Sequence, residues 1–137
     1  MAIKRTLFVS LLLMMFSFSQ AQRISDYKVK NNSNLADRTK MLDILRAKLY
    51  EGYRQEFVFV VNHFKVGNNY AWFMGDATRK DGKSIRLSDA EDCCHVEALF
   101  KKIGSKWYIA ESGAFSTDLW WDGIQDRNPN APSAIFY

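Results

Sequence analysis

The sequence predicts an α+β fold, in which one N-terminal helix packs on a curved four-stranded antiparallel sheet and an aromatic-rich C-terminal tail follows. One stretch alone has apolar residues at helical spacing, and four later stretches have strand-like composition with short turns between them. Aromatic residues then gather after the last strand. Because residues 35–137 contain no internal repeat, linker or low-complexity segment, we expect them to form a single domain.

The predicted helix runs from Leu35 to about Tyr53. Asn34 or Ser33 is expected to cap it, because a short polar side chain can accept hydrogen bonds from the free N–H groups of the first turn. Gly52 is expected to end it. The apolar face consists of four leucines, namely Leu35, Leu42, Leu45 and Leu49.

The four predicted strands form two hairpins. Residues 56–66 and 70–79 flank a Gly-Asn-Asn turn, and residues 93–103 and 106–115 flank a Gly-Ser turn. Strand alternation places one apolar set of the second hairpin toward the helix: Val96, Ala98, Phe100, Trp107 and Ile109. The expected faces of the first hairpin are both apolar: Phe57, Phe59, Val61, Trp72 and Met74 on one, and Val58, Val60, Phe64, Val66 and Phe73 on the other. One helix covers only one face, so the tail or a second copy of the chain is expected on the other.

The first 21 residues predict a signal peptide. Lys4 and Arg5 precede an apolar run of about fourteen residues, which is short of the roughly twenty that a membrane-spanning helix needs. Ser19 and Ala21 are small residues at the positions that signal peptidase reads, so cleavage is expected after Ala21. An uncleaved N-terminal anchor is the alternative. Residues 22–34 are polar and are expected to form a flexible arm.

The charge balance argues against a nucleic-acid partner. Loss of Lys4 and Arg5 with the signal peptide lowers the formal net charge from +4 to +2. We therefore expect an exported protein, periplasmic or extracellular, with no nucleic-acid partner and no membrane span after cleavage.

The order of one helix and four antiparallel strands resembles the cystatin-like and nuclear-transport-factor-2-like rolls over residues 35–116. The chain is also similar to small exported bacterial proteins of an uncharacterised family, through "LDILR" at 42–46 and "STDLWW" at 116–121. These rolls host isomerases, hydrolases, inhibitors and binding modules, so the resemblance implies a fold and leaves the chemistry open. The Gln-x-Val-x-Gly pattern of cystatin inhibitory loops is absent after residue 21.

Cys93 and Cys94 are adjacent and are followed by His95. Three interpretations remain open: packed inert thiols, a strained vicinal disulfide, or an intermolecular bond or metal role. A vicinal disulfide requires the strand to start at His95. Cys93, His95 and Glu97 share a face of a regular strand, but no metal-binding spacing is present, so we expect no metal and no cofactor.

Two further groups of residues have a chemical interpretation. His95, Glu97 and Ser112 are expected on one face and have the composition of a catalytic triad, without a nucleophile elbow, so no residue is predicted to be catalytic. Glu111 is expected to face the helix, where Arg38 or Arg46 pairs with it and Asp118 joins them, either as an internal salt bridge or as a polar pocket. Trp120 and Trp121 are expected to wall that pocket. The ligand-binding candidates are therefore Arg38, Arg46, Glu111, Asp118, Trp120 and Trp121.

These patterns predict an exported non-enzymatic module that binds a small molecule or protein and that forms a homodimer through the apolar outer face of the first hairpin. The alternative is a small isomerase or hydrolase with an acid–base pocket inside the roll, using Glu111, Asp118 or His95.

Overall fold

The computed structural model describes residues 22–137, and the expected signal peptide lies outside them. Its strands form one antiparallel sheet in the order β1-β2-β3-β4-β5. The α+β class with one main helix is confirmed, whereas the predicted number of four strands is wrong, because residues 22–137 form five. In chain order the elements are β1 (Ser25–Asp26), α1 (Leu35–Tyr53), β2 (Phe57–Gly67), β3 (Tyr70–Arg79), β4 (His95–Ile103), β5 (Lys106–Ala114), α2 (Ile124–Arg127) and the 3₁₀ helix η1 (Ser133–Phe136).

The additional strand, β1, lies in the segment 22–34 that was expected to be a flexible arm. β1 pairs with the end of β2, with Ser25 opposite Val66, and the Tyr27 N–H donates to the Phe64 carbonyl over 2.7 Å. Arg38 Nε of α1 donates to the Tyr27 carbonyl over 2.9 Å. The arm is therefore fixed both to the sheet and to the helix. A strand of two polar residues has no alternation, so the sequence pattern does not reveal it.

Helix α1 begins after Asn34, as expected, but the Asn34 side chain makes no capping bond to the helix. Its Oδ1 instead accepts from the Asn31 N–H over 2.9 Å, which holds the preceding turn. The helix ends at Tyr53, one residue beyond Gly52. Its C-cap, Arg54, has a positive φ of 53° and donates its N–H to the Tyr50 carbonyl. This left-handed ending is a common helix C-cap.

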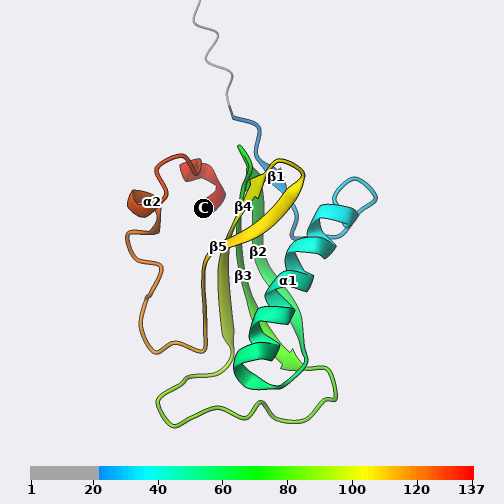
Figure 1. The fold of residues 1–137 in the computed structure, drawn as a ribbon, viewed down its shortest axis with the longest axis vertical. Coiled ribbons are helices and arrows are strands. Elements are labelled where there is room, and N and C mark those ends of the chain that lie inside the picture. Colours follow the sequence, from blue (N-terminus) through cyan, green and yellow to red (C-terminus); the bar gives the residue numbers. More distant parts are fainter. Residues whose placement is uncertain (1–21) are drawn as a thin grey trace, which may run out of the picture.

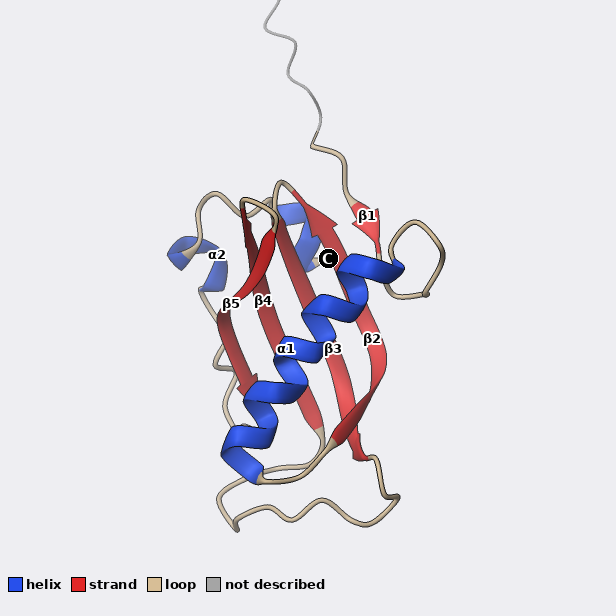
Figure 2. Cartoon of the chain, turned by 45° about the vertical axis from the view of Figure 1, so that its right-hand side comes forward, coloured by secondary structure: helices blue, strands red, loops and turns tan. Residues whose placement is uncertain are grey.

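Helix α1 and the C-terminal tail lie on opposite sides of the sheet (Figure 1), and α1 crosses the sheet obliquely (Figure 2). We call these the helix side and the tail side. The core on the helix side contains fully buried residues from α1 and from three strands: Met41, Leu45, Phe64, Phe73, Ala98 and Phe100. The main hydrophobic stabilisation comes from this layer.

A second, smaller core forms on the tail side. Trp72 of β3 and Leu99 of β4 are buried there beneath Ile124 of α2, Ala131, and Ile135 of η1. The tail itself therefore covers this part of the sheet. The sequence left two candidates for covering the second face of the sheet, the tail and a second copy of the chain. In the structure, tail residues pack on that face.

A bulge in β2 changes which residues share a face. Val61 is opposite Gly75 and His63 is opposite Met74, so Asn62 is an extra residue. An extra residue reverses the alternation beyond it. The helix side therefore receives residues from both parts of β2, namely Phe57, Phe59, Val61, Phe64 and Val66. Trp72 and Met74 lie on the tail side, so the expected faces of the first hairpin were wrong.

A similar bulge lies in β5. Leu99 is opposite Glu111 and Phe100 is opposite Ile109, so Ala110 is the extra residue. Trp107 and Ile109 pack on the helix side as expected. Glu111 pairs with Leu99 of the tail-side core, so it is on the tail side and not on the helix side.

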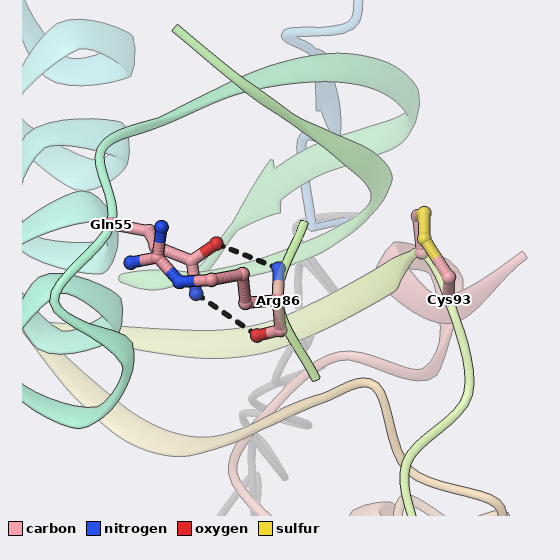
Figure 3. The surroundings of a disulfide bond; sticks show 4 residues. Gln55, Arg86 and Cys93 are labelled. Carbon is pink, nitrogen blue, oxygen red and sulfur yellow. Dashed lines mark hydrogen bonds between the residues drawn. A yellow bond between two sulfur atoms is a disulfide. The ribbon is translucent and has the colours of Figure 1, made fainter. Parts of the chain in front are cut away.

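The loop between β3 and β4 is held at its middle by Gln55, which is buried. The Gln55 amide donates to the Arg86 carbonyl over 3.0 Å and accepts from the Arg86 N–H over 2.8 Å (Figure 3). Nearer β4, the Tyr53 hydroxyl donates to Glu91 over 2.5 Å. Burial and this bond raise the pKa of Tyr53 to about 12. The loop thus has fixed anchors on the segment at the end of α1.

Candidate functional site

A buried carboxylate lies where the tail leaves β5. Glu97 of β4 is on the tail side and its side chain is only 2% exposed. Its Oε1 lies 2.6 Å from Nδ1 of His95, and its Oε2 accepts a hydrogen bond from Trp120 Nε1 over 3.0 Å. The other ring nitrogen of His95, Nε2, lies 2.7 Å from the Ser116 carbonyl oxygen. The cluster therefore joins β4 to the first residues of the tail.

The partners of His95 determine its charge. Both ring nitrogens face oxygen acceptors, so both can donate only when the ring is an imidazolium. Burial acts to lower the pKa of His95, but the hydrogen bonds to Glu97 and to the Ser116 carbonyl outweigh it, so the pKa is raised above its ordinary value. The buried carboxylate is thus paired, as a charge in an apolar environment must be.

Gly113 lets Trp120 reach Glu97. It is opposite Glu97 on β5, and a Cβ placed there would overlap the indole nitrogen of Trp120. A residue with any side chain would push the indole away from the carboxylate. Trp120 also contacts Trp121 edge-on at 5.9 Å between ring centroids, and Trp121 contacts His95 in the same way at 6.1 Å.

Further polar contacts fix the rest of the tail. Glu111 accepts from Arg127 Nε over 2.9 Å and also from the Asn128 amide. His63 Nε2 lies 2.6 Å from the Ile135 carbonyl oxygen, and Lys65 Nζ donates to the carbonyl of Tyr137. The two histidines of the chain therefore both contact backbone carbonyls of the tail.

The tail and the sheet form the sides of an open cleft of about 590 Å³. This volume is in the range of small-molecule sites. Its apolar walls come from both sheet and tail, and its polar groups come from the turn before α2 and from α2 itself. It is lined by Trp72, Met74, Leu119, Trp121, Asp122, Gly123, Ile124, Gln125, Asp126, Phe136 and Tyr137.

The structure separates the residues that were expected to form one ligand pocket. Glu111 binds the tail and not Arg38 or Arg46, because the bulge at Ala110 turns it to the tail side. Arg38 binds the N-terminal arm, and Arg46 pairs with Asp43 over 2.8 Å. Asp118 is exposed, and its only hydrogen bond within residues 22–137 is from its own N–H to Ser116 Oγ.

Two of the six candidates do lie at the tail-side site. Trp121 lines the cleft, and Trp120 binds the buried carboxylate beside it. Sequence reasoning missed Trp72, Phe136 and Tyr137 as cleft residues, although the aromatic composition of the tail was a signal for the last two. Arg46 lines a separate groove of about 490 Å³ between α1 and the start of β2.

The groups named for acid–base chemistry do not meet in one pocket. The bulge places Ser112 on the helix side, away from His95 and Glu97, so the expected shared face of these three residues was wrong. His95 has both nitrogens bound to protein oxygens and has none free for a substrate. The space between α1 and the sheet, where the alternative enzyme would have its pocket, is filled by the apolar core.

Cys93 and Cys94 are joined by a disulfide bond, and β4 starts at the next residue, His95 (Figure 3). Cys93 is exposed and Cys94 is half-buried against the helix-side core. The Cys94 carbonyl accepts from the Ala77 N–H over 2.8 Å. Within residues 22–137 no cluster of three or more His, Cys, Asp or Glu side chains has an arrangement that could hold a metal ion.

Comparison of the chain with protein-family models, with curated proteins and with solved structures gives no match. Across residues 22–137, no helix has both the length and the apolar character needed to cross a membrane. The site is therefore interpreted from its own geometry.

Proposed function

We propose that this protein is an exported, non-enzymatic binding module, and that its ligand binds in the cleft between the tail and the sheet. The observation that carries the proposal is the aromatic lining of that cleft by Trp121, in the turn before α2, and by Phe136 of η1, which packs on the buried Trp72 of β3. A concave site with aromatic walls and few polar groups is the usual form of a small-molecule site. The aromatic rings would supply contact area, and the polar groups of the α2 segment would orient the ligand.

The hydrogen bonds beneath the cleft support this proposal. The Glu97 cluster fixes Trp120, which stacks edge-on against Trp121, and the Glu111 contacts fix α2. A wall that is already held in place loses little conformational entropy when a ligand binds. The tail therefore acts as a fixed wall of the site rather than as a disordered segment.

The test is a two-dimensional NMR titration with a panel of monosaccharides, alkylamines, amino acids and small carboxylates. We expect binding members of the panel to shift the indole N–H signals of Trp72 and Trp121 and to leave that of Trp107, on the helix side, unchanged. Trp121→Leu should abolish these shifts, whereas Tyr108→Leu, which removes an exposed aromatic ring outside the cleft, should not. Shifts confined to other surfaces, or no shifts with any member, would contradict the proposal.

The homodimer hypothesis depends on the apolar outer face of the first hairpin, β2 and β3, and the tail partly covers this face. Val58 and Val60 of β2 remain 41% and 57% exposed. Two valine side chains are a small part of the roughly 800 Å² per partner that a stable interface buries. We therefore propose that the binding module acts as a monomer, and sedimentation of a single species at the monomer mass is the expected result.

Export is the remaining part of the proposal, and the N-terminal sequence features support it. Expression in a secreting bacterial host should give a protein that starts at Gln22 in the periplasmic or extracellular fraction. A chain that retains Met1 in the membrane fraction would instead indicate an uncleaved anchor.

A further inference from the structure

Two carboxylates line the cleft without a partner. Asp122 precedes α2 and Asp126 lies within it, and both line the cleft. Neither carboxylate makes a hydrogen bond or ion pair with any of residues 22–137. Glu111 on the same side of the sheet is in contrast fully engaged by Arg127 and Asn128. The cleft therefore has two carboxylates that no group in the described part of the chain neutralises.

The basic residues near the cleft do not neutralise this charge. No Lys, Arg or His is among the lining residues. Arg127 directs its guanidinium to Glu111 and to the backbone carbonyls of Trp120 and Asp122. Lys65 is bound to the Tyr137 carbonyl. The lining thus has two negative groups and no positive one.

The aromatic walls favour the same kind of ligand as the carboxylates. The faces of Trp, Tyr and Phe rings carry partial negative charge and attract organic cations, and groups of such rings recognise quaternary ammonium ions. Trp121, Phe136 and Tyr137 supply three rings to the cleft, and Trp72 is buried behind Phe136. Tyr137 is 80% exposed, so its ring is accessible to an incoming ligand.

We propose that the ligand of this cleft carries an organic ammonium group, which lies against the aromatic walls and near the carboxylates of Asp122 and Asp126. This inference rests on the proposed function, because it assigns a chemical class to the ligand of the same cleft. The two aspartates are exposed, so salt screens their attraction for the ammonium group. This attraction should therefore contribute to the affinity mainly at low ionic strength.

The test compares choline with its neutral isostere 3,3-dimethylbutan-1-ol and with the disaccharide cellobiose, in NMR titrations of the indole N–H signals. We expect choline to shift the signals of Trp72 and Trp121, with a dissociation constant about tenfold lower than that of the neutral isostere. The double variant Asp122→Asn/Asp126→Asn should weaken choline binding about tenfold at low salt and have little effect on the isostere. Asp118→Asn is the matched control, since Asp118 is an exposed aspartate that does not line the cleft.

The outcomes separate this inference from the proposed function. Equal binding of choline and the isostere, or tighter binding of cellobiose, with shifts at Trp72 and Trp121, would overturn the ammonium class and leave the cleft as a binding site. An equal effect of the Asp118 control and the double variant would also overturn it. If none of the three probes shifts these indole signals, the ammonium class is overturned. The titration with the wider panel of monosaccharides, alkylamines, amino acids and small carboxylates then tests whether the cleft binds any ligand.

Discussion

His95 and Glu97 form a charged pair on one face of β4, with Nδ1 of the ring 2.6 Å from the carboxylate and the carboxylate almost fully buried. They are two positions apart in the sequence, and their side chains point to the same face because side chains alternate along a strand. The pair would be unfavourable in an apolar layer without further partners. Trp120 and the Ser116 carbonyl supply these partners, and both belong to the tail. The position of the tail is thus coupled to the charge state of His95.

The stability of the protein should therefore depend on pH through His95. Its folded-state pKa is raised, so its stabilising contribution is complete below the unfolded pKa of about 6.5 and is lost as the pH rises through the higher folded value. The measurement is urea unfolding of wild type and His95→Gln from about pH 5.5 to about pH 9. At the acid end we expect His95→Gln to be less stable by roughly 1.5–3 kcal/mol, the range for hydrogen bonds to charged groups. The difference should decrease with rising pH, and a constant difference would contradict the assignment.

Gly113→Ala should displace Trp120, because the added Cβ would overlap the indole nitrogen. We expect a loss of roughly 1–3 kcal/mol in the free energy of unfolding, as for overpacking in other cores, together with a change in tryptophan fluorescence. Gly52→Ala in α1 is the control, since a Cβ at Gly52 has no neighbouring atom within 4 Å. That change should stabilise the helix by about 0.5–1 kcal/mol. Equal effects of the two substitutions would refute the close approach of Trp120.

Glu111→Gln should loosen α2 and leave the rest of the protein intact. Its partner Arg127 is 45% exposed, so the ion pair should contribute less than about 1 kcal/mol to global stability. The expected signature is faster amide hydrogen exchange at residues 124–128, with no change in α1. Glu51→Gln, an exposed substitution on α1, is the control. A loss of about 3–5 kcal/mol would instead indicate the buried helix-to-sheet pair that the sequence suggested.

The vicinal disulfide predicts a defined mass. Protein purified from an oxidising compartment should be two hydrogen atoms lighter than the sum of its residues, and reductant should restore them. Cys94→Ser should react with one equivalent of a thiol reagent, whereas untreated wild type should not react. A full thiol mass in wild type would exclude the bond, and a dimer that reductant dissociates would indicate an intermolecular one.

The sequence was sufficient for the elements whose signal is repeated over many residues. The apolar spacing of α1 and the turns of the two hairpins predicted most of the layer on the helix side, including Leu42, Leu45 and Leu49 of α1 and Trp107 and Ile109 of β5. Leu35 is exposed, and Met41 takes its place in the buried face of the helix. β1 has only two residues and no alternation, so it could not be recognised. Its place is decided by hydrogen bonds to β2 and α1 that involve distant parts of the chain.

The site was harder to predict because it depends on two bulges. Alternation assigns each residue to a face correctly only as far as the first extra residue, and Asn62 and Ala110 have no property that marks them as extra. The bulge at Ala110 moves Glu111 from the helix side to the tail, which removed the expected pocket with Arg38 and Arg46. Trp120 and Trp121 were recognisable as candidates from composition, but Glu97, the hydrogen-bond partner of Trp120, was identified only by the fold.

The measurement that tests the account most directly is hydrogen exchange of the tryptophan indole N–H groups in wild type and Glu97→Gln. The Trp120 N–H donates to the buried carboxylate, so in wild type it should exchange much more slowly than that of Trp121. Glu97→Gln keeps the side-chain shape but removes the charge, and should speed the exchange of Trp120 because bonds to charged acceptors are stronger. Slow exchange that Glu97→Gln accelerates would establish that the tail is fixed to the sheet through Glu97. Exchange of Trp120 as fast as that of Trp121 in wild type would contradict it, and the cleft would lose its fixed wall.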